Sequence, residues 1–178
     1  MRIPFLDKGN PLPPLTDAEC KAILELTNNS VRMALITGLN SGISQTELLQ
    51  LRKSDVDLKA QTLNIPMKRG LRRVVLPLRT AQLLGEYMKT HDSLYLFPFA
   101  STSFIKLISD IGTRCGLKLN WQRIRSTYIR NAARAGVPIL TCAHNVGTDP
   151  ANIKHYYLLT PEEERAKINN KINNIASD

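Results

Sequence analysis

Residues 42–57 read Gly42-Ile43-Ser44-Gln45-Thr46-Glu47-Leu48-Leu49-Gln50-Leu51-Arg52-Lys53-Ser54-Asp55-Val56-Asp57. The glycine predicts the end of one helix. Ser44, followed three residues later by Glu47, makes the Ser-x-x-Glu pattern of a capping box, which predicts the start of the next helix. Leucines then supply a short apolar face, and Ser54 and Asp55 predict a turn before a strand. This stretch therefore predicts a helix, a turn and the start of a strand, and the other elements are placed relative to it.

The composition predicts one globular domain with a polyanionic partner. The chain has 178 residues, of which 43% are hydrophobic, enough for a proper core. Its net charge is +9. Such a surplus favours nucleic acid, because lysines and arginines that neutralise phosphates release condensed counterions. The positive charge is spread over several segments, which disfavours a single basic helix lying on a membrane.

The cysteines and the hydrophobic runs predict a cytoplasmic protein. Three scattered cysteines, Cys20, Cys115 and Cys142, argue against a disulfide framework. The sequence shows no signal-peptide pattern and no run long enough to span a membrane. Cys142, His144 and His155 lack a zinc spacing, and the chain has no glycine-rich phosphate loop. We therefore expect neither a metal nor another cofactor, and no membrane partner.

Periodicity and capping signals predict a mainly helical α+β domain over residues 16–178, after an extended, proline-rich lead-in at 1–15. Thr16, Ser44, Thr80, Asn120, Asp149 and Thr160 are predicted helix caps, and Ser101, Thr102 and Ser103 are the candidates for the cap of the 101–115 helix. A β-hairpin is predicted between them, with strands at 62–67 and 72–76 and a basic turn at 68–71. We expect Pro66 to mark an edge strand or a bulge. Helices are predicted at 16–26, 31–39, 45–51, 80–88, 101–115, 122–135, 138–147 and 151–158, with a last, polar helix from 160.

Several motifs in order resemble the catalytic domain of the tyrosine recombinase (phage integrase) family. The family writes the opening stretch as Gly-Leu-Arg-x-x-Glu-Leu-Leu, follows it with a hairpin that has a basic turn, and continues with Leu-Phe-Pro, His-x-x-Arg-His-Thr-Phe, Ala-Gly-Val and Leu-Gly-His. The matching segments here are 42–49, 62–76, 96–98, 122–128, 135–137 and 146–148. The resemblance runs from about residue 15 to 164.

The resemblance implies metal-free phosphoryl transfer, in which a tyrosine attacks a DNA phosphate while two arginines clamp its oxygens. Carried over by position, Tyr157 matches the nucleophile, Arg125 one clamp and Lys68 the hairpin lysine. Tyr156 is the alternative nucleophile if the preceding loop is one residue shorter. Three family positions are replaced: Ser44 stands for the other arginine, and Gln122 and Thr148 stand for the two histidines.

These replacements predict impaired cleavage. Removing one preorganised donor to a developing charge lowers the rate roughly 10²–10³-fold. Ser44 is neutral and too short for a bidentate grip, and Thr148 does not release a proton near neutral pH. We expect a DNA-binding protein that resembles a site-specific recombinase and is impaired or inactive in strand cleavage. The alternative is an active recombinase with a non-standard site, in which Arg32, Arg69 or a DNA-induced rearrangement supplies the missing charge.

The predicted partner is double-stranded DNA. On the hairpin, Arg69, Arg72 and Arg73 are the candidate contacts. On the 122–135 helix, Arg123, Arg130 and Arg134 share one face, so they form either a DNA-facing stripe or an ordinary exposed face. Arg125 lies roughly 160–200° away from them, which suits a buried clamp. An unrelated helical interaction protein with incidental basicity is a third hypothesis.

The resemblance also implies how such a domain assembles. Family members usually carry an additional N-terminal DNA-clamping domain, which this sequence does not show. They assemble on DNA, often by exchanging a C-terminal helix between protomers. We therefore expect a homo-oligomer on DNA through the Thr160-capped helix, and a nucleoid-associated protein in the cytoplasm.

Overall fold

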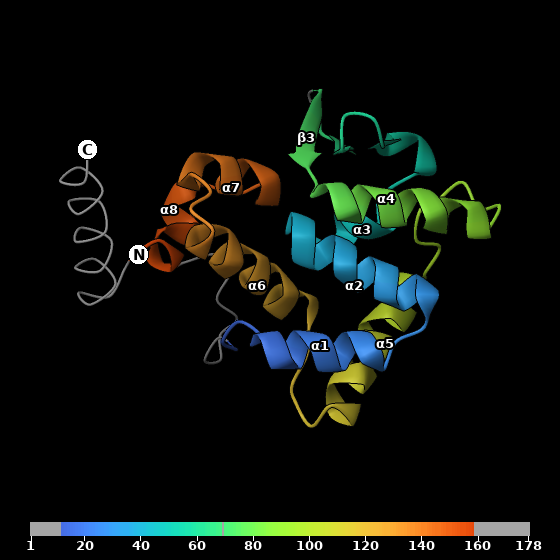
Figure 1. The fold of residues 1–178 in the computed structure, drawn as a ribbon, viewed down its shortest axis with the longest axis horizontal. Helices are drawn as coiled ribbons and strands as arrows, with labels where there is room; N and C mark the ends of the chain where they lie inside the picture. Colours follow the sequence, from blue (N-terminus) through green and yellow to red (C-terminus); the bar gives the residue numbers. More distant parts are fainter. Residues whose placement is uncertain (1–11, 69, 159–178) are drawn as a thin grey trace, which may run out of the picture.

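The computed structural model describes residues 12–68 and 70–158. The predictions for most of the lead-in, for Arg69 and for the helix from Thr160 lie outside the described residues. Within them, a small sheet lies at one edge of a mainly helical molecule, next to α4 and α7 (Figure 1). The predicted mainly helical α+β class is confirmed.

The described α-helices follow the predicted order. They are α1 Asp17–Glu25, α2 Asn29–Ser41, α3 Gln45–Gln50, α4 Leu78–Tyr87, α5 Ser101–Arg114, α6 Trp121–Arg134, α7 Ile139–Val146 and α8 Pro150–Ile153. Three short 3-10 turns join them at Lys53–Asp55 (η1), Met88–Thr90 (η2) and Lys154–Tyr156 (η3). The 151–158 helix predicted from the sequence is therefore shorter, and ends as a 3-10 turn.

Four predicted caps are confirmed, and those of α4 and α5 are wrong; α5 begins at Ser101 after Ala100, which makes no side-chain cap. Thr16 and Ser44 each form both halves of a capping box, while the side chains of Asn120 and Asp149 accept from Arg123 N and Ala151 N. Thr80 does not cap α4. That helix begins at Leu78, and Thr80 lies buried within its first turn. Pro77 occupies the N-cap position instead, without a side-chain hydrogen bond.

The sheet has three antiparallel strands in the order β1-β2-β3: Val56–Asp57, Thr62–Pro66 and Leu71–Val75. The predicted hairpin is β2-β3, and its register pairs Leu63 with Val74. β2 is the central strand, but Pro66 lies at its end, beyond its two-residue pairing with β1. Along β3 burial alternates with period two, so Arg72 and Val74 share the buried face.

The core has two hydrophobic clusters, and α6 connects them. Its first turns contribute Trp121 and Ile124 to the larger cluster, which α2, α4, α5 and the sheet complete. Its later turns contribute Ile129 and Ala132 to a smaller cluster with α7 and α8. Figure 1 shows α6 running from the neighbourhood of α2 to α8. Arg125 therefore lies on the part of α6 between the two clusters.

Candidate nucleic-acid interface

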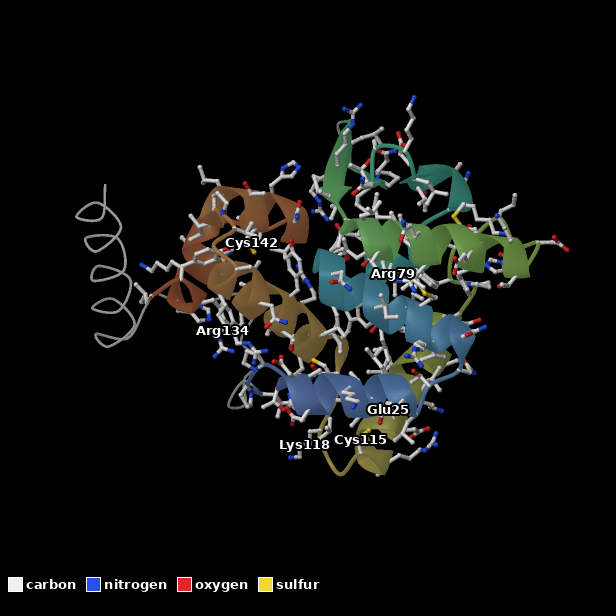
Figure 2. All side chains as sticks on the ribbon, in the orientation of Figure 1. Glu25, Arg79, Cys115, Lys118, Arg134 and Cys142 are labelled. Carbon is white, nitrogen blue, oxygen red and sulfur yellow. The ribbon has the colours of Figure 1, made fainter. Side chains whose placement is uncertain are left out.

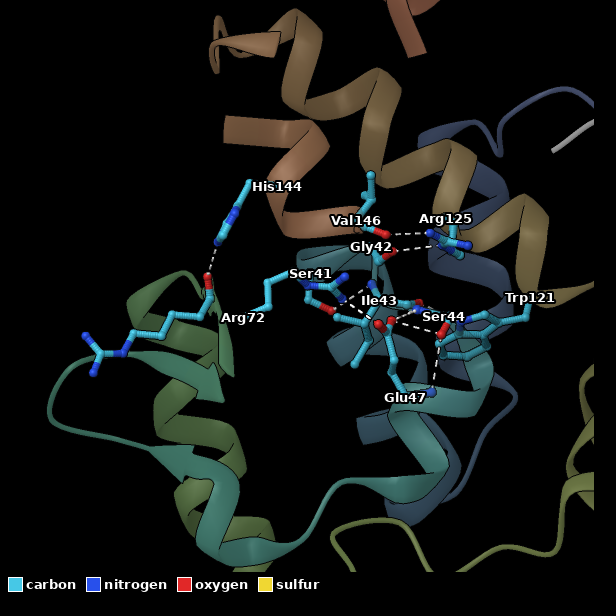
Figure 3. A network of polar contacts seen from close by, with 11 residues as sticks. Ser41, Gly42, Ile43, Ser44, Glu47, Arg72, Trp121, Arg125, His144 and Val146 are labelled. Carbon is cyan, nitrogen blue, oxygen red and sulfur yellow. Dashed lines mark hydrogen bonds and ion pairs between the residues drawn. The ribbon is translucent and has the colours of Figure 1, made fainter. Parts of the chain in front are cut away.

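Arg125 is buried, as the sequence predicted for a clamp residue. Its Nε donates to the carbonyl of Gly42 at 2.9 Å, and its Nη2 donates to the carbonyl of Val146 at 2.7 Å. These carbonyls terminate α2 and α7, where helix C-termini carry partial negative charge. Burial lowers the pKa of Arg125, and the nearby Arg72 acts in the same direction while Glu47 opposes it. The guanidinium is thus held at the junction of three helices (Figure 3).

Ser44 is fully used as a helix cap. Its hydroxyl accepts from Glu47 N at 3.2 Å and donates to Glu47 Oε2 at 2.8 Å. The same carboxylate oxygen accepts from Ser44 N at 2.7 Å. Both the side chain and the amide at position 44 are therefore satisfied within α3. Position 44 therefore supplies no positive charge, and α3 is capped without one.

Arg72 reaches the space beside Ser44 from the sheet. Its Nη2 donates to Glu47 Oε1 at 2.7 Å, and its side chain is 8% exposed. The carboxylate of Glu47 therefore bridges Ser44 on one oxygen and Arg72 on the other. Sequence reasoning missed this role and named Arg32 and Arg69 as replacements, although Arg32 is exposed on α2. The usable signal was the strand alternation, which places Arg72 on the same face as apolar Val74.

The loop after α7 covers the Arg72 guanidinium. Gly147 adopts the left-handed conformation at φ +68°, and a Cβ built on it would lie 1.6 Å from Arg72 Nη1. The left-handed backbone at this position therefore favours glycine, and the Arg72 guanidinium packs directly against it. Thr148 follows, half-buried, and its hydroxyl accepts from Asn152 Nδ2 at 3.2 Å. The hydroxyl is thus engaged by α8.

The two candidate nucleophiles pack against the smaller hydrophobic cluster. The Tyr157 hydroxyl is buried and has no hydrogen-bond partner within the described chain. Burial raises its pKa, and the adjacent Cys142 thiol adds to the shift. The Tyr156 ring lies against His155, with ring centroids 4.1 Å apart. The raised pKa of Tyr157 is the opposite of the lowered pKa that activates a nucleophile.

Comparison with solved structures identifies the architecture. The XerA recombinase matches at TM-score 0.75 and 22% identity over 92% of this chain. The Tn1549 transposon integrase bound to transposon right end DNA matches at 0.77 and 15% over 93%. The XerH site-specific recombinase bound to its difH substrate matches at 0.69 and 19% over 92%. This chain has the fold of the tyrosine recombinase catalytic domain. It spans 66%, 68% and 56% of those three chains, and no protein-family model matches it.

On this recombinase fold, the remaining predicted site residues occupy separate places. Lys68 is exposed in the hairpin turn, next to Arg69, which is outside the described residues. Gln122 is half-buried on α6, one helical turn before Arg125. Arg73 is exposed on β3, and its carbonyl is hydrogen-bonded to the His144 ring at 3.1 Å. The structure thus gathers Ser44, Arg72, Arg125 and Thr148 around one region, while Lys68 is exposed in the hairpin turn.

The predicted stripe on α6 needs a correction. Arg123 is 7% exposed, because Nε donates to Pro13 O at 2.7 Å, Nη1 to Lys118 O at 2.8 Å and Nη2 to Glu19 at 2.8 Å. It anchors α1 and the preceding segment, and does not form a DNA-facing surface. Arg130 is held by its neighbour Asn131, and Arg134 lies at the end of α6 away from the hairpin (Figure 2). The helical period predicted the side of α6 on which Arg123 lies. It could not predict that the segment around Pro13 covers this side chain.

Within the described residues, no helix is long and apolar enough to cross a membrane. The same part of the chain has no group of three or more His, Cys, Asp or Glu side chains arranged for a metal ion.

Proposed function

We propose that this protein binds duplex DNA through a tyrosine recombinase-like domain, spanning residues 16–178, that is impaired in strand cleavage. The observation that carries the proposal is the contrast between two positions, Arg125 and Ser44. A buried clamp-type arginine is kept in place, whereas the position of the second family arginine is a serine engaged by its own helix cap. The fold is retained without the cation that stabilises the transition state.

The tyrosine adds support for impaired cleavage. A nucleophilic tyrosine must lose its proton as it attacks, and the raised pKa of Tyr157 opposes that loss. With Gln122 and Thr148 in place of histidines, the chain also lacks a side chain at these positions that titrates near neutral pH. These features point to a pseudoenzyme in recombination or in the regulation of integration by mobile elements.

Charge and exposure support the DNA surface. The net charge is +9, and Lys68 and Arg73 are exposed on the hairpin. On this proposal the hairpin meets the phosphate backbone, and the protein is associated with the nucleoid. Assembly on DNA through the segment after residue 158 is part of the same proposal.

Duplex binding tests the first half of the proposal. Fluorescence anisotropy with a 30-base-pair duplex, at several salt concentrations, should give a steep linear fall of log Kobs against log salt. The Arg73→Gln variant should reduce the slope by about 0.9, the value for one lost phosphate contact. Lys21→Gln, on an exposed face of α1, is the matched control and should leave the slope unchanged. Absence of binding, or a flat salt dependence, would overturn DNA binding.

A suicide DNA substrate tests the second half. It traps any covalent protein–DNA link, which is then counted on a denaturing gel. We expect no adduct above the background of Tyr157→Phe. An adduct in the wild type that disappears in Tyr157→Phe would establish the active-recombinase alternative, and one lost only in Tyr156→Phe would move the nucleophile by one residue.

A further inference from the structure

A solvent-open pocket lies at the opposite end of α3 from Ser44. Its volume is about 430 Å³, within the range of small-molecule sites. The lining comes from the end of α3, from η1, from the end of β2 and from the segment after η2, and consists of Gln50, Arg52, Ser54, Asp55, Pro66 and Tyr95. None of these residues was assigned to the clamp, nucleophile or proton-transfer positions above. The pocket is therefore a separate candidate site.

The backbone beneath the pocket is held by an antiparallel pairing. Arg52 lies opposite Tyr95 in an isolated β-bridge, which two backbone hydrogen bonds of 2.9 and 2.8 Å close on either side. In this kind of pair the two opposing side chains share one face and lie close together. The Asp55 carboxylate adds a further restraint, because its Oδ2 accepts from Arg52 N at 2.8 Å. The Arg52 guanidinium and the Tyr95 ring therefore project from a restrained backbone on the same side.

The polar groups that line the pocket are available to a ligand. Among the described residues, the side chains of Gln50, Arg52 and Ser54 make neither an ion pair nor a hydrogen bond as donors to another residue. The Asp55 carboxylate uses Oδ2 for the Arg52 amide and keeps Oδ1 for a further donor. The Tyr95 ring is 46% exposed. The pocket thus combines an aromatic surface with a guanidinium, a carboxylate oxygen, an amide and a hydroxyl.

This combination matches the chemistry of an unpaired nucleobase. A base stacks by its face on an aromatic ring and is recognised by hydrogen bonds along its edges. A carboxylate only accepts hydrogen bonds and a guanidinium only donates them. Guanine serves both, because its Watson–Crick edge carries adjacent N–H donors and its O6 and N7 are the acceptors that arginine binds bidentately. In a duplex the Watson–Crick edge is already paired with cytosine, so the guanine must be unpaired.

We propose that this pocket binds an unpaired guanine base, with Tyr95 stacked on its face, Asp55 accepting from its Watson–Crick edge and Arg52 donating to O6 and N7. The base belongs either to a single strand or to a free nucleotide, which present the same edges. The pocket is next to the hairpin, because Pro66 ends β2 two residues before the exposed Lys68, about 7 Å of extended chain. The assignment rests on the proposed function only for DNA as the source of the strand.

Single-stranded oligonucleotides test the pocket without a duplex. In fluorescence anisotropy, a labelled thymidine oligonucleotide of about 11 nucleotides with one central guanine should bind at least fivefold tighter than the same oligonucleotide with thymine or adenine at that place. Tyr95→Ala should weaken its binding roughly tenfold, as expected for the loss of one stacked base. Tyr95→Phe keeps the ring and should stay within twofold. Equal affinity of the wild type for the three oligonucleotides overturns the proposal.

Asp55→Asn gives the sharpest test of the edge contacts. The amide oxygen of asparagine can still accept from Arg52 N, whereas its NH₂ group opposes the N–H donors of guanine. The guanine preference should therefore disappear, while binding of the all-thymidine oligonucleotide stays within twofold. Arg52→Gln should also abolish the preference. Its control is Arg114→Gln, which removes an exposed charge at the end of α5 and should leave the preference unchanged.

The outcomes separate this proposal from the proposed function. Near-ultraviolet circular dichroism checks that each variant is folded, and a guanine preference that persists in folded Asp55→Asn and Arg52→Gln overturns the pocket. A wild type that binds duplex DNA without any guanine preference also overturns the pocket and leaves the proposed function intact. A guanine preference without duplex binding does the reverse. Competition with guanosine monophosphate identifies the source, because a free-nucleotide site is displaced at concentrations similar to the Kd of the oligonucleotide and a strand site is not.

Discussion

Two regions of the molecule are built from the same parts and differ in one respect. In the first, Thr16 caps α1 and Glu19 completes the capping box and binds the distant Arg123. In the second, Ser44 caps α3 and Glu47 completes the box and binds the distant Arg72. Each is a capping box whose glutamate is paired with an arginine from another element.

The difference lies in what else each arginine contacts. Arg123 donates to two backbone carbonyls as well as to Glu19, and so ties three segments together. Among residues 12–68 and 70–158, the Arg72 side chain hydrogen-bonds to Glu47, its Nε has no partner, and Arg125 is a second buried arginine nearby. The same motif is therefore a completed anchor in the first region, and in the second it leaves one donor of the arginine without an acceptor among the described residues. Variants that separate these roles test the comparison, beginning with the arginines.

Replacing Arg123 and Arg72 should change the free energy of unfolding most, and by different amounts. Arg123→Met should lower the free energy of unfolding by about 3 kcal/mol, because it breaks a largely buried ion pair and leaves two carbonyls without their donors. Arg72→Met should lower it by about 1 kcal/mol, since the lost ion pair is offset by relief of repulsion with Arg125. Urea unfolding monitored by circular dichroism measures both, with exposed Arg73→Met as control. Equal losses for the two variants would contradict the comparison.

Removing the caps should have smaller and similar effects. Thr16→Ala and Ser44→Ala should each lower the free energy of unfolding by about 1 kcal/mol, the usual value for an N-cap side chain. The reason is local, because each change leaves an amide at the start of a helix without its acceptor. The same urea titration applies, and Thr102→Ala, in the exposed first turn of α5, is the control. A much larger loss for Ser44→Ala would show that Ser44 does more than cap its helix.

The smallest expected effect is the contribution of Glu19, in the first region, to the pH dependence of stability. The Thr16 amide, together with Arg123, holds the pKa of Glu19 below its usual range despite the opposing effect of burial. A lowered pKa means that the ionised carboxylate stabilises the fold above the unfolded pKa, near 4.3, and that this stability is lost as the pH falls through the folded value. Glu19→Gln should therefore melt below the wild type at pH 7 and converge with it in acid.

Thermal melts between pH 7 and 2.5 measure this convergence. Glu25→Gln, in the exposed pair with Lys21, is the matched control on the same helix, and should change the melting temperature little at any pH. A Glu19→Gln deficit that persists unchanged at the lowest pH would show that the side chain acts through packing and not through its charge.

Some features of the site could be predicted from the sequence because they depend on neighbouring residues. The Ser44–Glu47 box, the stop at Gly42 and the Asn120 cap are contacts across four residues or fewer, with recognisable residue types. The angular separation of Arg123 from Arg125 also follows from the helical period. The prediction from Thr80 was wrong because threonine also occurs inside the first turn of a helix, and here Pro77 is the N-cap and the helix begins at Leu78.

The contacts of Arg123 and Arg72 could not be predicted from neighbouring residues. Arg123 is buried by a segment 110 residues earlier in the chain, and Arg72 reaches a glutamate 25 residues away. The strand alternation places Arg72 on the inner face of β3, but not against Glu47. Burial of Tyr157 beside Cys142 likewise depends on how α7 and α8 pack.

The sequence by itself determined the order of the helices, four of their caps, the hairpin and the loss of an arginine at position 44, because these are properties of local hydrogen bonding and of residue identity. Only the tertiary structure decided that Arg72 enters the space beside Ser44 and that Arg123 leaves the surface. The physical reason is that an arginine side chain is long and its charge must be paired when buried. Its role is therefore set by the acceptors that distant segments bring within its reach.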